Sequence, residues 1–249
     1  MGNTNWQTSQ VDYWNNIANE YDYLYKTKWS KLENFDVQKE LKTLLNNDKK
    51  SILDLGCGTG LGYEIFNSMA LKNFKYLGVD ISKSMLSIAK SKFPSVDFIQ
   101  SSMCDLDCKN EEFDVVISLF CSFSYEENSR STVSEIYRVL KPGGLCYISM
   151  LNKFSIRRLL NMKFGEFEMY ATRKSSIIET TPAKVFSKNS SKQIFNDFGF
   201  EKVRVLGQGF LSGVFENSYL WELDKMTSNL LPDFTHMITV IAYKPIHKG

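Results

Sequence analysis

The sequence has little histidine, no paired-cysteine motif and no long hydrophobic run. Only two histidines occur in 249 residues, His236 and His247, which disfavours a zinc site. The five cysteines include no Cys-x-x-Cys spacing, so we expect reduced, mostly buried thiols and no bound metal ion. No apolar stretch approaches the roughly 20 residues that a membrane-spanning helix needs.

Charge of one sign is not clustered either. Lysine and arginine number 30 and aspartate and glutamate 28, a formal net charge of +2 without a basic block. A nucleic-acid-binding surface usually shows such a block. The first residues also lack the hydrophobic core of a signal peptide. We therefore expect a cytoplasmic protein, monomeric or homodimeric, that binds neither nucleic acid nor a membrane.

The most informative stretch is residues 51–62, Ser-Ile-Leu-Asp-Leu-Gly-Cys-Gly-Thr-Gly-Leu-Gly. A short apolar run ends in a glycine cluster and a helical pattern follows, which predicts a buried strand, a tight turn and a helix. Glycine lets the backbone turn sharply and lets a ligand approach it closely. The spacing is not that of a dinucleotide fingerprint, because Leu61 stands where G-x-G-x-x-G needs its third glycine.

A second predicted strand, residues 75–80, ends in an acid. Asp80 lies twenty residues after Gly60, and an acid in this place reaches the ribose of a nucleoside held on the first strand. A carboxylate accepts two hydroxyl hydrogen bonds at once, which suits a vicinal diol. The alternative is that Asp80 is the N-cap of the helix that opens at Ser82.

The pattern Asp54-x-Gly56-x-Gly58-x-Gly60 resembles motif I of the class I S-adenosylmethionine (SAM)-dependent methyltransferases. Residues 81–86 resemble the segment after motif I's partner strand, residues 112–120 the fourth motif, and residues 138–144 the structural turn that ends in Lys-Pro-Gly-Gly. The resemblance covers most of residues 11–244. It implies a methyltransferase with SAM as cofactor. It also implies a Rossmann-like, doubly wound α/β sheet of seven strands with the last strand antiparallel.

The same resemblance assigns residues to the cofactor. The glycines would wrap the methionine part of SAM, with the Asp54 carboxylate near its ammonium group. Ser102 stands where the family often has an acid that accepts from the adenine amino group, so either Ser102 or Asp105 would make this contact. The cofactor-binding residues expected are Tyr21, Asp54, Gly56, Cys57, Gly58, Gly60, Asp80, Ile81, Met85, Ser102, Met103 and Leu119.

The acceptor pocket is expected beside the fourth strand. Residues 8–28 and 34–46 show helical patterns, and residues 13–22 resemble the opening of many small-molecule methyltransferases, in which a helix lies over the cofactor. Packing on the core is the alternative for its aromatic residues. The substrate-binding residues expected are Tyr13, Phe120, Phe123, Tyr125 and Asn152. The catalytic candidates, as a base or by positioning, are His236, Tyr21 and Tyr125, and the alternative for His236 is a polar residue that opens the last strand.

We expect one domain, divided into an N-terminal helical cover (1–46), a SAM-binding core (47–150), a lid insertion after the fifth strand (151–187) and a C-terminal helix with strands (188–249). The function expected is methyl transfer to a nitrogen or oxygen atom of a small-molecule acceptor, such as a natural product or sugar. The scarcity of bases favours nitrogen, because an amine needs only to be neutral and aligned. The alternatives are an RNA-base methyltransferase and a non-catalytic SAM-binding partner subunit.

Overall fold

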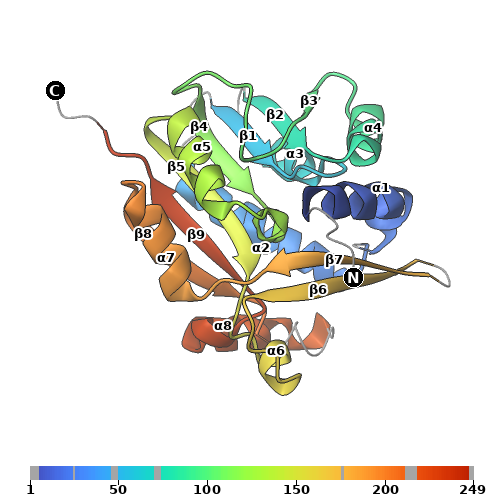
Figure 1. Ribbon diagram of the computed structural model, residues 1–249. Helices are drawn as coiled ribbons and strands as arrows, with labels where there is room; N and C mark the ends of the chain where they lie inside the picture. The colour runs from blue at the N-terminus through green and yellow to red at the C-terminus, as the bar shows by residue number, and fades with distance from the viewer. Residues whose placement is uncertain are drawn as a thin grey trace.

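The computed structural model describes residues 6–24, 26–45, 50–69, 74–174, 177–210 and 218–246. A seven-stranded sheet runs through its centre in the order β3-β2-β1-β4-β5-β9-β8 (Figure 1). The first five strands pair in parallel, and β9 is antiparallel to both of its neighbours. The α/β fold and its antiparallel last strand are therefore as the sequence predicted. The strand bounds are β1 Ser51–Leu55, β2 Lys75–Asp80, β3 Asp97–Gln100, β4 Phe113–Ser118, β5 Leu140–Leu151, β8 Glu201–Gln208 and β9 Met237–Tyr243.

Helices cover both faces of the sheet, so its central strands are apolar on both sides. Along β1, Ile52 packs into the cluster beneath α2 (Lys28–Leu44), α3 (Leu61–Ser68) and α4 (Lys83–Lys92). Leu53 and Leu55 pack into the cluster beneath α5 (Ser129–Val139) and α7 (Lys188–Asp197). This alternation follows from the two-residue period of a strand, and it places the glycine turn at the carboxyl edge of a rigid sheet.

Two elements lie outside this sandwich, at the same edge. Helix α1 (Trp6–Leu24) contacts α4, and the antiparallel hairpin of β6 (Phe167–Lys174) and β7 (Ile177–Lys184) passes beneath α1 (Figure 1). The side-chain oxygen of Asn15 accepts from the Ser82 hydroxyl at 2.8 Å and from the Ser84 N–H at 3.1 Å. These bonds fix α1 over the start of α4. Along the chain, the short helix α6 (Ile156–Leu160) precedes the hairpin, and α8 (Trp221–Leu230) follows β8 and precedes β9.

The helix boundaries near the N-terminus differ from the prediction. The sequence pattern suggested one helix over 8–28 and a second from residue 34, whereas α1 ends at Leu24 and α2 begins at Lys28. Thr27 explains the early start, because its hydroxyl accepts from the Ser30 N–H at 3.0 Å and so caps α2. Helix α8 was not predicted, and His247 lies outside the described residues. Among the helices described, none combines the length and the apolar character needed to cross a membrane.

Candidate active site

A cavity of about 390 Å³ opens at the carboxyl ends of β1 and β2, beneath α1. It is lined by the glycine turn, the end of β2, the loop after β3, the loop after β4 and one side of α1. Nine of the residues expected at the site line it: Tyr21, Gly56, Gly58, Asp80, Ile81, Met85, Ser102, Met103 and Tyr125. Eleven further lining residues had not been assigned to the site: Trp6, Gln7, Gln10, Trp14, Val79, Ser101, Cys104, Ser122, Glu126, Glu127 and Asn128.

The glycine turn is shaped to leave space. Gly56 and Gly58 have φ values of 73° and 53°, in the left-handed region that glycine adopts without strain. A Cβ atom on Gly56 would lie 2.5 Å from the Cβ of Ser122, so packing alone requires glycine there. A Cβ on Gly58 would meet only a Tyr21 ring atom, at 4.0 Å. At Gly58 a side chain would instead fill the cavity, as expected of a cradle for a ligand.

Asp80 joins the glycine turn to the residue that caps α4, but it is not itself the N-cap of that helix. Its carboxylate accepts from the Gly58 N–H at 2.8 Å and from the Ser82 N–H at 2.9 Å. Burial raises the pKa of Asp80, and these two backbone bonds oppose the rise. The N-cap of α4 is Ser82, whose hydroxyl accepts from the Met85 N–H at 3.1 Å. Each Asp80 oxygen keeps a further lone pair for a ligand.

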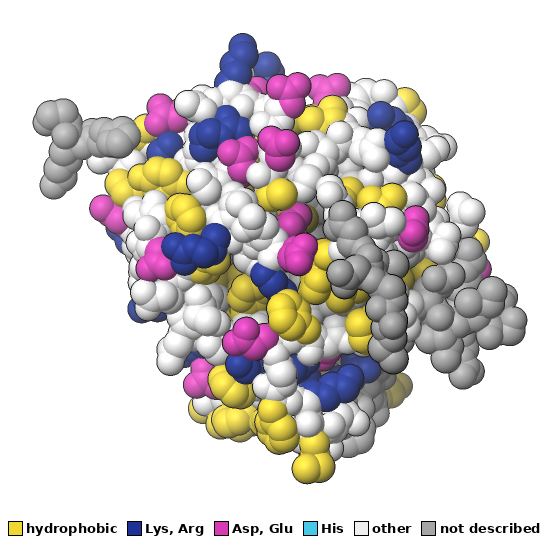
Figure 2. Space-filling model, in the orientation of Figure 1, with side chains coloured by type: hydrophobic (Ala, Val, Ile, Leu, Met, Phe, Trp, Pro, Cys, Tyr) yellow, Lys and Arg dark blue, Asp and Glu magenta, His cyan; other side chains and the backbone are white. Residues whose placement is uncertain are grey.

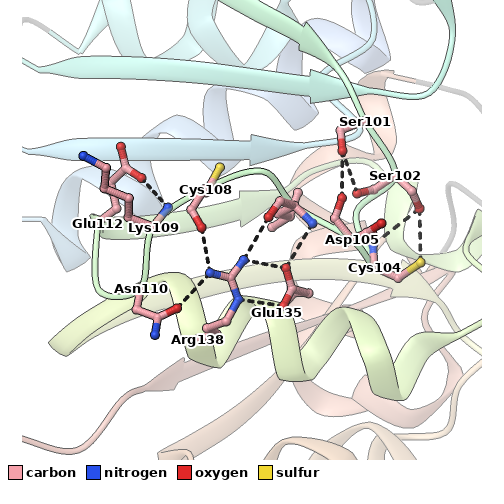
Figure 3. Close-up of polar contacts among 11 residues, drawn as sticks. Ser101, Ser102, Cys104, Asp105, Cys108, Lys109, Asn110, Glu112, Glu135 and Arg138 are labelled. Carbon is pink, nitrogen blue, oxygen red and sulfur yellow. Dashed lines mark hydrogen bonds and ion pairs between the residues drawn. The ribbon is translucent and has the colours of Figure 1, made fainter.

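The loop after β3 is joined to the loop after β4 by one side-chain hydrogen bond. The Ser102 hydroxyl donates to Glu126 Oε2 at 3.3 Å, and Glu126 Oε1 accepts from the Asn128 N–H at 2.9 Å. Asp105 lies on the same loop as Ser102, and its backbone oxygen accepts from the Ser101 hydroxyl at 2.8 Å (Figure 3). The Glu126 carboxylate therefore lies beside Ser102, although position 102 itself carries no acid.

Arg138 holds the rest of that loop in place. It projects from α5 with Glu135, donates to both Glu135 carboxylate oxygens at 2.7 Å, and reaches the backbone oxygens of Cys108 at 2.6 Å and Leu106 at 3.0 Å (Figure 3). This arginine belongs to the stretch 138–144 that the sequence analysis took as structural. It keeps residues 106–110 close to α5, directly after the residues of the same loop that line the cavity.

Aromatic residues of α1 form the roof. The Trp14 ring meets the rings of Tyr21 and Tyr125 edge to face, with centroids 6.1 and 4.8 Å away. Besides the Asn15 bonds to α4, two bonds near its start tie the helix to the loop after β4 and to the hairpin. Trp6 Nε1 donates to the Tyr125 backbone oxygen at 2.8 Å, and Gln10 Nε2 donates to the Pro182 oxygen in β7 at 2.7 Å.

Four expected cofactor residues do not line the cavity. Asp54 is 2% exposed, and its Oδ2 accepts from the Tyr76 hydroxyl while a Cβ atom on Gly62 would lie 2.2 Å from that oxygen. Its side chain thus faces α3 behind the turn, because it stands two residues before Gly56 on a buried strand. Burial raises the pKa of Asp54 to about 7. Cys57, Gly60 and Leu119 are packed inside the fold.

Three expected acceptor residues pack against the protein interior instead: two are core residues and the third, Phe120, is partly buried. Tyr13 is 2% exposed and packs with Ile17 and Met85. Phe123 is fully buried with its ring centroid 5.6 Å from that of Phe186, and Phe120 packs against the helix-covered sheet. The backbone at Phe120 and Cys121 is left-handed, with φ of 49° and 66°. This sharp turn after β4 directs the two phenylalanines inward, which the sequence pattern did not indicate.

His236 and Asn152 lie elsewhere, at a second cavity. The Asn152 amide donates to the backbone oxygens of Asp233 at 2.9 Å and Thr235 at 2.8 Å, so it is structural. Burial and the nearby Arg157 charge lower the pKa of His236 to about 4. A cluster of Cys121, Leu151, Ala183, Val185 and Met237 lies at this end of the molecule, with Tyr125 packed on it. Because Tyr125 lines the first cavity and Leu151 the second, this layer separates His236 from the glycine turn, contrary to its expected catalytic role.

Comparisons with known proteins agree with this geometry. The family model described as "Methyltransferase domain" matches residues 52–144. An uncharacterized protein of Methanocaldococcus jannaschii, MJ1252, is 29% identical over 250 residues, covering 94% of this chain and 90% of its own. The ubiquinone/menaquinone biosynthesis C-methyltransferase UbiE of Campylobacter jejuni is 31% identical over 158 residues, 59% of this chain and 65% of that protein.

Two solved structures share the fold. A possible histamine N-methyltransferase from Thermotoga maritima superposes with a TM-score of 0.65 at 18% identity, covering 94% of this chain and 99% of that one. Haemonchus contortus phosphoethanolamine N-methyltransferase 2, solved with phosphomonomethylethanolamine and S-adenosylhomocysteine, gives a TM-score of 0.64 at 19% identity, covering 96% and 59%. With its matching domain, sheet order and glycine cradle, the chain belongs to the class I SAM-dependent methyltransferase superfamily and is an enzyme that uses SAM as its methyl donor.

Proposed function

We propose that this methyltransferase transfers the methyl group to a nitrogen atom of a small-molecule amine, with a hydroxyl oxygen as the alternative acceptor atom. The observation that carries the proposal is the make-up of the cavity. Four carboxylates and four aromatic rings line it, and none of its lining residues in the described chain is lysine, arginine or histidine. Carboxylates and aromatic faces both attract cations. The acidic residues are Asp80, Asp105, Glu126 and Glu127, and the aromatic ones are Trp6, Trp14, Tyr21 and Tyr125.

Some of the residues that line the cavity would bind the cofactor. Gly56 and Gly58 would hold its methionine part, and Asp80 would accept from the ribose hydroxyls with its remaining lone pairs. Ile81 and Met103, which line the same cavity, would contact adenine. For the adenine amino group we propose Glu126, because its carboxylate is already hydrogen-bonded to Ser102 and thus held at the expected position.

The remaining residues would serve the acceptor. Bound SAM supplies an electrophilic methyl group on its sulfonium, so the chain chiefly has to align the acceptor and exclude water. The lone pair of the amine forms the new N–C bond as the S–C bond breaks, and the electron pair of the S–C bond stays on sulfur. The amine then loses a proton, which Glu127 at the cavity wall could take up. Tyr21 and Tyr125 would orient the acceptor through their hydroxyl groups.

Helix α1 would act as a cover that opens for exchange. Single side-chain hydrogen bonds from Trp6 and Gln10 hold it to the loop after β4 and to β7. Covers of this kind sequester the reacting centre and release product. We propose the same division of the chain as before, with residues 1–46 as the cover and 151–187 as the lid insertion.

A second candidate is methylation of a carbon atom on an aromatic ring. The name of one relative favours it, since the Campylobacter protein is named as a ubiquinone/menaquinone biosynthesis C-methyltransferase. The two structural neighbours are named as N-methyltransferases instead. The Trp14–Tyr125 wall would stack on a flat ring as readily as it would face a cation. The acidic lining is what favours the amine.

The test is label transfer from methyl-tritiated SAM. The protein is incubated with separate pools of small amines, of hydroxyl compounds including quinols, and of RNA. We expect label in the amine pool and none with Asp80→Ala as the control. Label in RNA, or only in quinols, would contradict the proposal.

A further inference from the structure

The second cavity has a chemistry of its own. It measures about 200 Å³ and lies between α6, the start of β6 and the residue before β9. Its charged and titratable lining residues are Arg157, Arg158, Lys163, Glu168 and His236. We propose that this cavity binds a phosphate group, either free or as a phosphate monoester.

Two of these charged residues, one arginine and the glutamate, form an ion pair in the cavity wall. Arg158 is 4% exposed and pairs with Glu168. Its guanidinium also donates to the backbone oxygens of Lys153, Lys163 and Gly165, at 3.2, 3.3 and 2.9 Å. Almost all of its five N–H donors are therefore used within the protein. The Arg158–Glu168 pair is neutral as a unit and holds α6 to the hairpin.

The other two cations are left for a ligand. Within the described chain, Arg157 and Lys163 have no ion-pair partner, although both line the cavity. Their summed charge of two matches the charge of about −1.5 to −2 that a phosphate monoester carries at pH 7. An arginine fork also fits the oxygens of a phosphate. Figure 2 shows lysine and arginine side chains together below the middle of the visible face, above a hydrophobic lower end.

Buried polar groups complete the lining. Nδ1 of His236 is buried and has no hydrogen-bond partner among the described residues. A buried polar atom without a partner costs about 1–3 kcal/mol, so its presence calls for a ligand or a water. Ser155, which is 2% exposed, also lines the cavity, and its hydroxyl makes no capping bond to α6. Both side chains are candidate donors to phosphate oxygens.

The test uses the fact that the chain has only two histidines. In protein labelled with ¹³C-histidine, the His236 ring signal is assigned with a His247→Gln variant. Inorganic phosphate is then titrated at constant ionic strength, with chloride in exchange. We expect a saturable shift of the His236 signal, with the dissociation constant at least tenfold weaker in Arg157→Gln and in Lys163→Gln. Arg130→Gln, an exposed arginine on α5 that pairs with Asp197, should bind phosphate as the unchanged protein does.

Absence of a saturable shift with both inorganic phosphate and phosphoethanolamine up to about 50 mM, well above the 1 mM that corresponds to about −4 kcal/mol, would overturn the proposal. The proposal would also be overturned if both single variants, Arg157→Gln and Lys163→Gln, bound phosphate as tightly as the unchanged protein does. The source of the phosphate is decided by comparing phosphoethanolamine with ethanolamine in the same titration. A shift with phosphoethanolamine alone supports a phosphate monoester, and a shift with inorganic phosphate alone supports the free ion. These titrations need no methyl transfer, so their result is independent of the proposed function.

Discussion

The Ser102 hydroxyl and the Glu126 carboxylate are hydrogen-bonded across 3.3 Å, joining the loop after β3 to the loop after β4. Serine stands where related methyltransferases often carry the acid for the adenine amino group. The acid is therefore present in space although it is absent at that point of the sequence. It comes from a loop 24 residues further along the chain.

Glu126→Gln is expected to weaken binding of S-adenosylhomocysteine by about 1.5–3 kcal/mol, the usual contribution of a hydrogen bond to a charged group. It should also remove the preference for this ligand over S-inosylhomocysteine, which has no amino group. Calorimetry with both ligands measures the two effects. The matched control is Glu127→Gln, which should keep the preference.

Restoring the acid at the family position should rescue the variant. Ser102→Asp in the Glu126→Gln background is expected to recover most of the affinity and the preference for adenine. If Glu126→Gln binds both ligands as the unchanged protein does, the adenine contact lies elsewhere and Asp105 becomes the candidate.

Asp80 serves the turn and the ligand together, so its two roles have to be separated. Asp80→Asn keeps one oxygen acceptor and should weaken binding of S-adenosylhomocysteine by one to a few kcal/mol, about the value of hydrogen bonds to a charged group. The 2′- and 3′-deoxy analogues should lose less affinity in this variant than in the unchanged protein, because the partner of the missing hydroxyl is already gone. Equal losses in both proteins would show that the ribose does not contact Asp80.

The sequence predicted the parts of the site that a short motif determines. The glycine turn, Asp80 and Met85 come from one strand–turn–helix–strand unit, in which spacing along the chain sets position in space. The doubly wound sheet of seven strands with its antiparallel last strand was expected from the family resemblance. Tyr21 and Tyr125 were found through a family resemblance on either side of that unit.

The residues that were missed or misplaced depend on long-range packing. Trp6 and Glu126 reach the cavity through contacts with distant loops, to Tyr125 and Ser102, and no local period marks them. Phe123 was expected in the pocket, but the left-handed turn at Cys121 directs it into the core. His236 directly precedes β9, one residue before the strand begins, but nothing in its sequence neighbourhood shows that a layer of apolar side chains lies between it and the glycine turn.

One hydrogen bond that holds α1 over the cavity can be removed by a single substitution. Trp6→Phe removes the indole N–H that bonds to the Tyr125 backbone oxygen and keeps an aromatic ring. We expect S-adenosylhomocysteine to dissociate several-fold faster in stopped-flow experiments, because one hydrogen bond is worth about 1 kcal/mol. Trp29→Phe is the control, since the Trp29 indole bonds to Glu33 within α2. Equal dissociation rates in the two variants would argue that α1 does not open for exchange.

Asp54 gives a prediction about stability and pH. Burial raises its folded-state pKa to about 7, well above the value of 3.8 expected for an exposed aspartate. Between about pH 4 and pH 7 the folded protein therefore keeps a proton that the unfolded chain has released. The folded state binds more protons in this window, so Asp54 makes the free energy of unfolding fall as the pH rises through it.

Asp54→Asn should remove this dependence, because asparagine resembles the protonated acid and can still accept from the Tyr76 hydroxyl. In urea unfolding we expect the variant to match the unchanged protein at pH 5 and to equal or exceed its stability at pH 8. Asp114 should make the free energy of unfolding depend on pH in the opposite direction. Burial acts to raise its pKa, but bonds from Ser51 and Lys141 outweigh burial and lower it. Its stabilisation is present at pH 8 and lost on acidification, so Asp114→Asn should destabilise the protein at pH 8. If Asp54→Asn is the less stable protein at pH 8, the ionised Asp54 carboxylate is compensated inside the fold, and the raised pKa is contradicted.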